Sequence, residues 1–175
     1  MYQESIEILR SVGAKPLEAV AWLNLAGARM ALGQVAEARR SFEEAIRMAR
    51  ESDERRCLAA ALVAFASLEL LARGAPAALP LLVEARPMLE ALCDRLELCK
   101  LAIAEGHAAL ASGETAAGRI DLARRLAAEI GIGVDAPVAT SIADLVGAQR
   151  SFEQGRPLRG GYRPEDVPEA LRGVV

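Results

Sequence analysis

The residue types that carry most enzyme and metal chemistry are scarce in this chain. His107 is the single histidine, so neither a zinc site built on two histidines nor an HExxH helix can form. A Ser-His-Asp triad would have to use His107, and the sequence contains no G-x-S-x-G elbow for its serine. A lone histidine on a helix is usually a packing or surface residue. We therefore expect no catalytic residues, no metal site and no enzyme activity.

Cofactor-binding loops and reactive thiols are not indicated either. Gly131-Ile132-Gly133 is too short for a dinucleotide-binding fingerprint and follows a helical pattern, whereas the fingerprint requires a strand. Cys57, Cys93 and Cys99 are odd in number and have no metal-ligand spacing. We expect them to be buried thiols in a reducing cytoplasm, because unpaired cysteine is among the most buried residue types. The expectation is a cytoplasmic chain without a cofactor.

Charge and hydropathy argue against nucleic-acid and membrane partners. The formal net charge is −3 and the pI is near 5.4, which gives no general attraction to polyanions. Acidic residues interrupt the arginine pairs at Arg39-Arg40, Arg55-Arg56 and Arg124-Arg125. The longest uninterrupted apolar run, from Cys57 to Ala66, is far shorter than the roughly 20 residues of a membrane span.

The apolar pattern of the chain repeats with a period of about 40 residues, a length found among helical repeat arrays. One row of equivalent positions contains Tyr2, Phe42, Leu82 and Leu122, and another contains Trp22, Leu62, Ala102 and Ile142. A third row holds the small residues Ala26, Ala66 and Gly106. Hydrophobic residues make up 53% of the chain and aromatic residues only 3%, so alanine and leucine dominate, and both favour helix. Such a repeat is typical of helix pairs that bury their apolar faces against neighbouring pairs.

Helix breakers divide the repeat into elements. Pro16 suits the first turn of a helix, and Gly33 suits a helix end. The expected helices span residues 16–32, 35–49, 54–72, 76–92, 94–111, 115–130 and 137–152, preceded by a short one within residues 1–13. The expected units are a half repeat (1–14), three repeats (about 15–53, 54–93 and 94–133) and a capping helix (137–152). Residues 1–152 would then form one all-α solenoid of about 8 helices.

Three features depart from a regular array. Pro80 and Pro87 fall inside the helix expected at 76–92, where each removes a backbone hydrogen bond, so we expect a kink or a split near Pro87. Residues 1–13 align with the second half of a unit, which predicts a fragment of a longer protein. Residues 153–175 do not follow the period, which predicts a flexible or partly helical tail. This tail would fold back into a groove of its own or of a neighbouring chain, with the apolar residues Leu158, Tyr162 and Val167 as anchors.

The first complete unit resembles a tetratricopeptide repeat. The residues that carry the resemblance are Trp22, Leu25, Gly33, Ala38, Phe42 and Ala45. The unit departs from the family at Ala26, where glycine is usual, and in its period, which is longer than that of the standard repeat. Long repeats rich in alanine and leucine are similar to those in bacterial multidomain signalling proteins. The resemblance implies a right-handed superhelix of antiparallel helix pairs, in which the first helix of each pair lines a concave groove.

The resemblance also implies which residues face that groove. They are Leu23, Asn24, Met30, Val63, Ser67, Leu70, Lys100, Ile103, His107, Asp144 and Arg150. This set is apolar toward the N-terminal side and charged toward the C-terminal side, which suits an amphipathic helix with a charged end. The clamp that grips chaperone C-termini would need a lysine at Leu23, asparagine at Gly27 and Ala64, and arginine at Ala104. Only Lys100 fits that clamp, so we do not expect it.

Three functional hypotheses remain open. The leading one is a protein-interaction module that is the C-terminal regulatory or scaffolding part of a larger bacterial signalling protein. Its partner would be a protein, a peptide or another domain of the parent chain. The second is a ligand-sensing module that gates a neighbouring kinase or DNA-binding domain. The third is self-association through the exposed N-terminal repeat end near Tyr2 and Ile6.

Overall fold

The computed structural model describes residues 2–156, and this part of the chain contains eight helices and no strand. The helices are α1 (Tyr2–Ser11), α2 (Lys15–Ala31), α3 (Val35–Glu51), α4 (Arg55–Arg73), α5 (Ala75–Leu92), α6 (Arg95–Ala111), α7 (Ala117–Glu129) and α8 (Pro137–Glu153). Every complete helix begins and ends close to the bounds expected from the sequence. The prediction of an all-α solenoid of about eight helices is confirmed.

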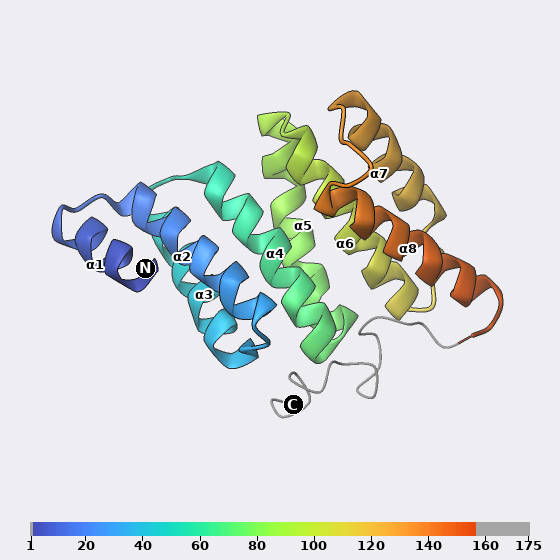
Figure 1. Ribbon diagram of the computed structural model, residues 1–175, viewed down its shortest axis with the longest axis horizontal. Helices are drawn as coiled ribbons and strands as arrows, with labels where there is room; N and C mark the ends of the chain where they lie inside the picture. The colour runs from blue at the N-terminus through green and yellow to red at the C-terminus, as the bar shows by residue number, and fades with distance from the viewer. Residues whose placement is uncertain (1, 157–175) are drawn as a thin grey trace.

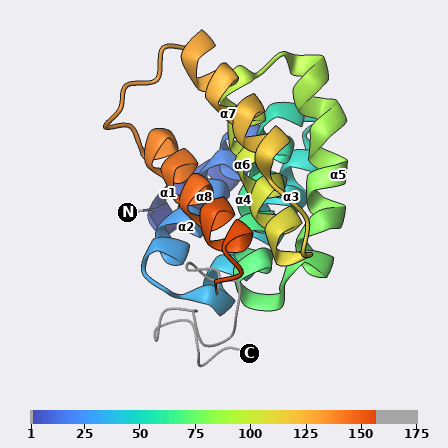
Figure 2. The same ribbon diagram turned by 90° about the vertical axis from the view of Figure 1, so that its right-hand side faces the viewer.

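The helices form two layers. Figures 1 and 2 show α2, α4, α6 and α8 side by side in one layer and α3, α5 and α7 in the other. Consecutive helices pack as antiparallel neighbours, and α2 also contacts α4, α4 contacts α6, and α6 contacts α8. The first helix of each pair therefore lies in the layer that is expected to line the groove.

Local signals set the ends of the helices. Pro16 and Pro137 lie in the first turns of α2 and α8, where a missing N–H costs no hydrogen bond. The Asp94 side chain caps α6 by accepting a hydrogen bond from the Glu97 backbone N–H at 3.2 Å. The residues that follow α1, α3 and α5 adopt positive φ at positions that lie one period apart: Gly13, Asp53 and Cys93.

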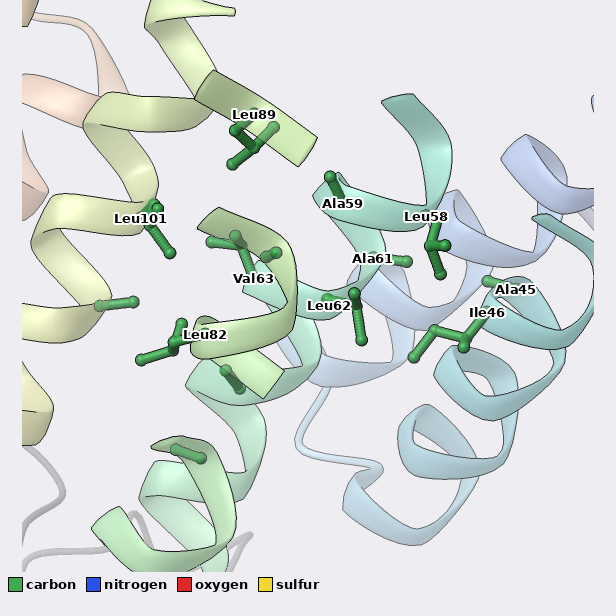
Figure 3. Close-up of a cluster of buried hydrophobic side chains, with 14 of the residues drawn as sticks. Ala45, Ile46, Leu58, Ala59, Ala61, Leu62, Val63, Leu82, Leu89 and Leu101 are labelled. Atoms are coloured by element: carbon green, nitrogen blue, oxygen red, sulfur yellow. The ribbon is translucent and has the colours of Figure 1, made fainter. Parts of the chain in front are cut away.

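The main hydrophobic core lies between the layers from α3 to α6. Figure 3 shows Leu62 of α4, Leu82 and Leu89 of α5, and Leu101 of α6 converging there. All four leucines are almost fully buried, and fully buried alanines fill the space between them: Ala45, Ala59, Ala61, Ala78 and Ala85. Small alanine side chains let the helices approach closely, so the composition of the chain accounts for the tight packing of this core.

The expected split of α5 near Pro87 does not occur. The helix runs without interruption from Ala75 to Leu92 with Pro80 and Pro87 inside it. Both prolines are exposed, as are Pro76 and Val83, the residues whose carbonyl groups lose a helical donor. Water can hydrogen-bond to these carbonyl oxygens on the accessible face, which explains why the helix continues.

Two expectations about single residues are wrong. Ile6 is only 3% exposed, because it packs with Ala21 and Leu25 of α2 and is not available for self-association. Cys93 is exposed, whereas Cys57 and Cys99 are buried as expected. Cys93 occupies the left-handed position just after α5, at the end of the helix and outside the core. The interpretation of residues 157–175 as a tail with anchors Leu158, Tyr162 and Val167 lies outside the described residues.

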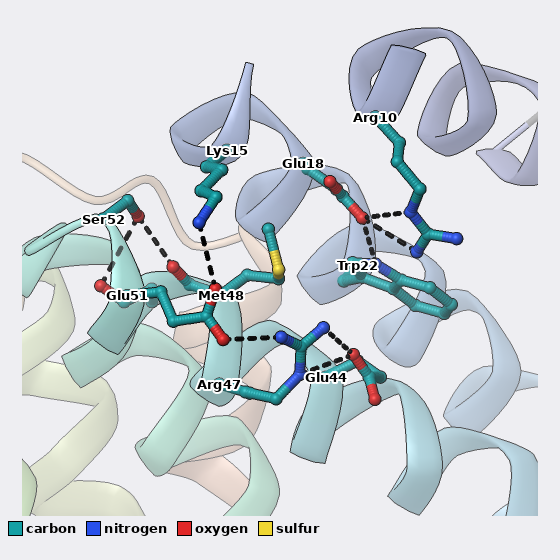
Figure 4. A network of polar contacts seen from close by, with 10 residues as sticks. Arg10, Lys15, Glu18, Trp22, Glu44, Arg47, Met48, Glu51 and Ser52 are labelled. Atoms are coloured by element: carbon teal, nitrogen blue, oxygen red, sulfur yellow. Dashed lines mark hydrogen bonds and ion pairs between the residues drawn. The ribbon is translucent and has the colours of Figure 1, made fainter. Parts of the chain in front are cut away.

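Two buried carboxylates join neighbouring helices, which the sequence pattern did not indicate. Glu18 is 3% exposed and accepts hydrogen bonds from Arg10 at 2.9 and 3.1 Å and from the Trp22 indole at 3.3 Å (Figure 4). Glu69 of α4 is equally buried and pairs with Arg39 of α3 at 2.8 Å. Because an unpaired buried carboxylate is costly, these ion pairs hold adjacent helices in one arrangement.

An exposed network lies beside the first of these pairs. Arg47 pairs with Glu44 at 2.7 Å and with Glu51 at 2.6 Å, and Lys15 reaches Glu51 at 3.3 Å (Figure 4). Arg47 and Lys15 hold the pKa of the Glu51 carboxyl below its ordinary value. Such exposed pairs contribute little stability, but they keep this outer surface of α3 charged and hydrated.

Candidate partner-binding groove

A groove of about 1520 Å³ runs along the first helices of the units. Its wall consists of side chains from α2, α4, α6 and α8, and Arg156, just beyond α8, reaches it too. The Ala- and Leu-rich repeats place these four helices in one layer, so their outward faces share one surface (Figure 2).

Most of the residues predicted for the groove lie around it. They are Leu23, Asn24, Val63, Ser67, Leu70, Lys100, Ile103, His107 and Asp144. Met30 does not line the groove, because it packs against the cluster around Phe42 in the core. Arg150 does not line the groove either. It is exposed, but the helical rotation per residue places it about 120° around α8 from Asp144. Whether the groove binds a partner stays a prediction.

The structure adds groove residues that the family positions did not include. They are Leu71, Glu97, Val138, Ser141, Ser151 and Arg156 among others. Ser141, Asp144, Ala148 and Ser151 follow each other at intervals of three and four along α8, the spacing of one helix face. The spacing from Asp144 is therefore the sequence signal that indicates Ser141, Ala148 and Ser151 as residues of the same helix face.

The N-terminal half of the groove is mainly apolar. Leu23 of α2 lines it together with Val63 and Leu70 of α4, and Ala60 and Ala64 belong to the same wall. Asn24 and Ser67 are the polar side chains in this half, and the Ser67 hydroxyl donates to the Val63 carbonyl oxygen at 3.2 Å. Because the Ser67 donor is already satisfied, this half offers a partner mostly apolar surface.

The C-terminal half of the groove carries the charges. Lys100 and Glu97 of α6 form an ion pair of 2.6 Å, and Asp144 of α8 is exposed on the opposite wall. Ile103 lies among these polar groups but is only 7% exposed and belongs to the core between α6 and α8. A partner therefore meets charged and hydroxyl groups here, with little of Ile103 accessible.

His107 is held neutral in this half of the groove. Burial between the helices lowers the pKa of His107 from 6.5 to about 4, and the negative charge of Asp144 opposes this shift only in part. At neutral pH the imidazole therefore carries no charge. The groove contains two carboxylates, Glu97 and Asp144, and two permanent cations, Lys100 and Arg156.

His107→Gln is expected to flatten the pH dependence of stability between pH 7 and pH 5. Folded His107 stays neutral down to a pKa of about 4, whereas the unfolded chain binds this proton near pH 6.5. The unfolded state thus binds more protons in this window, and the protein loses stability as the pH falls, by about 2 kcal/mol from pH 7 to pH 5. Urea unfolding at both pH values measures the loss. An equal loss in His107→Gln would contradict the assignment.

The described residues contain neither a metal-binding cluster nor a membrane-spanning helix. Within residues 2–156, no group of three or more His, Cys, Asp or Glu side chains is placed to hold a metal ion. None of the helices described is long and apolar enough to cross a membrane. The groove is thus the feature on which a functional proposal can rest.

Comparison with known proteins identifies one family. Residues 17–91, which cover nearly all of α2 to α5, match the family model described as tetratricopeptide repeat. No curated protein and no solved structure matches the chain.

Proposed function

Residues 17–91 belong to the tetratricopeptide-repeat family, and we propose that the chain uses its groove to bind one segment of a protein partner. The family generally mediates protein–protein interaction and is typically not catalytic. The observation that carries the proposal is the groove of about 1520 Å³ along α2, α4, α6 and α8. A surface of this size with an apolar wall and a polar end is the kind that holds peptides or helices.

The division of the groove supports an amphipathic helix as the bound segment. Its apolar face would lie on Leu23, Val63 and Leu70, and its polar end would meet the side chains around Lys100 and Asp144. The segment would belong to a separate protein or to another domain of the same parent chain. The resemblance of the long repeats to those of bacterial signalling proteins supports a regulatory or scaffolding role in the cytoplasm.

A charge reversal in the groove tests this proposal. Asp144→Arg is expected to reduce partner capture at least about tenfold, since a reversed charge in a contact surface costs more than about 1.4 kcal/mol. Asp144 is exposed, so the variant should fold normally. Ile103 is a poorer choice, because a charge at this buried position would disturb the core.

Arg150→Glu is the matched control. Arg150 lies on the same helix and is exposed, but it does not line the groove, and its substitution reverses a charge of the same size. Affinity capture with the immobilised chain, followed by quantitative mass spectrometry, compares the two variants. The groove assignment fails if Asp144→Arg keeps every partner, or if Arg150→Glu loses the same ones.

Ligand sensing is a second candidate, favoured by the cluster of polar groups at one end of the groove. Ser141, Asp144 and Ser151 of α8 stand opposite Lys100 and His107 of α6, an arrangement that would also surround a small polar molecule. A ligand that binds the folded state raises the melting temperature. A thermal-shift screen with metabolites separates the two functions, because a protein-binding module should show no hit.

A further inference from the structure

The chain leaves its last helix at the wall of the groove. Arg156, just beyond α8, lines the groove. Leu70 and Leu71 line it as well, and they lie in the last turn of α4, which ends at Arg73. Because α2, α4, α6 and α8 run in the same direction (Figure 1), the carboxyl ends of these helices lie along one edge of their layer. The segment that follows Arg156, residues 157–175, therefore starts at that edge of the groove.

The spacing of the helices determines how far this segment can reach. An extended chain advances about 3.3 Å per residue, and packed helices lie about 10 Å apart. About three residues are thus enough to cross one helix of the layer. Counted from Arg156, Tyr162 can reach α4 after crossing α6, and Val167 can reach α2. These are the two helices that supply the apolar half of the groove.

The apolar half of the groove suits the side chains that the segment would bring. The groove residues of α2 and α4 include Val63 and Leu70 and contain no charged side chain. Tyr162 and Val167 would cover this surface and leave the water, which is favourable. The glycines at 160 and 161 have no Cβ atom, so the backbone before Tyr162 can approach the wall closely.

Attachment at the groove favours this segment over the same segment of another molecule. A short flexible tether gives a local concentration of about 1 mM. With an intrinsic Kd of about 0.1 mM, the groove would be occupied about ten times more often than it is open. A second copy at micromolar concentration would fill only a small fraction of the grooves with that affinity.

We propose that residues 157–175 bind back into the groove of their own chain, with Tyr162 on α4 and Val167 on α2, and compete there with the protein partner. This inference rests on the proposed function, since the groove is the site for which the segment and the partner compete. The segment acts as an intramolecular inhibitor. A partner has to displace it, which lowers the apparent affinity of the partner about tenfold.

Cross-linking in the full chain locates the segment. Ser67→Cys in the groove and Tyr162→Cys are combined with Cys93→Ser, which removes the exposed native thiol. A short bis-maleimide is expected to join the two new thiols within one monomer. Arg150→Cys with Tyr162→Cys is the matched control, because Arg150 is exposed and close to Arg156 along the chain but does not line the groove. The proposal fails if the control pair reacts as fast, or if the product is mainly a cross-linked dimer.

A peptide probe tests the competition. A fluorescein-labelled peptide with the sequence of residues 157–175 is expected to bind the full chain carrying Tyr162→Asp and Val167→Asp at least about tenfold more tightly than the wild type. The reason is that the wild-type groove is already occupied. Both substitutions lie beyond the described helices and leave their packing intact. Fluorescence anisotropy measures the two affinities, and equal binding or no binding to either protein would contradict the proposal.

Failure of this inference is distinguishable from failure of the proposed function. Asp144→Arg reports whether the groove captures a protein partner, and the cross-linking and peptide measurements need no partner. If Asp144→Arg keeps every partner while Ser67→Cys is cross-linked to Tyr162→Cys, the partner site lies elsewhere and the segment still binds the groove. If Asp144→Arg loses its partners and the cross-link preference is absent, the groove binds partners without intramolecular inhibition.

Discussion

Gly106→Ala is expected to lower the free energy of unfolding by about 1–3 kcal/mol, as overpacking of a close helix contact does. A Cβ atom at Gly106 of α6 would lie 2.6 Å from one methyl carbon of Leu145 and 3.1 Å from the other. Leu145 of α8 is fully buried in a cluster with Leu110 and Ile120, so its methyl groups would have to move against other core side chains. The gain in helix propensity from alanine, about 1 kcal/mol, is too small to offset this clash.

Gly27→Ala and Gly147→Ala are the controls for this prediction. Both glycines lie inside helices, and a Cβ atom at either position would meet no atom within 4 Å. These variants should be neutral or more stable by up to about 1 kcal/mol. Urea unfolding of the three variants measures the difference. If Gly106→Ala behaves like the controls, α8 does not pack on α6 as closely as the structure shows.

Phe42→Ala is expected to destabilise the protein by about 3–5 kcal/mol, the usual cost of removing a large buried aromatic ring. Phe42 of α3 is completely buried among Ala26, Val35 and Leu68, and its ring stacks on Phe65 with centroids 5.6 Å apart. The truncation would leave a cavity where α2, α3 and α4 meet. Loss of the stacking contact adds to the effect.

Tyr2→Ala provides the comparison, since Tyr2 occupies the equivalent position one period earlier. Tyr2 is 42% exposed at the outer side of α1. Its truncation should cost less than about 1 kcal/mol, as is usual for a largely exposed residue. Thermal or urea unfolding of both variants measures the contrast. Similar losses for the two would show that α1 is covered in solution by something other than α2.

The fold was largely predictable from the sequence. Helix ends followed from local signals such as Pro16 and Gly33, which act through backbone conformation and need no distant partner. Most of the groove was predictable as well, because a repeat carries positions such as Leu23 and Val63 from one unit to the next. The groove residues that have no counterpart in the repeat pattern, such as Glu97 and Arg156, were not predicted.

Burial at the ends and between the units was less predictable. Tyr2 and Ile6 were both expected near an exposed repeat end, yet Ile6 is buried and Tyr2 is partly exposed. Nothing in the sequence pattern indicated that Glu18 and Glu69 would be buried. Glu18 pairs with Arg10, 8 residues away, and Glu69 pairs with Arg39, 30 residues away, as well as with Arg73 on its own helix. The pairs between helices depend on how the two helices pack against each other, which the sequence of one helix does not determine.

By itself, the apolar period determined that this protein is a row of helix pairs, because each pair must cover its apolar face with the next pair. That the first helices face one side was implied by the resemblance to tetratricopeptide repeats. Only the tertiary structure decided which side chains stay accessible. The close approach of α6 and α8 at Gly106 buries Ile103 and much of His107 while leaving Asp144 exposed. Accessibility depends on distances between helices, and these distances are set by packing across the whole array.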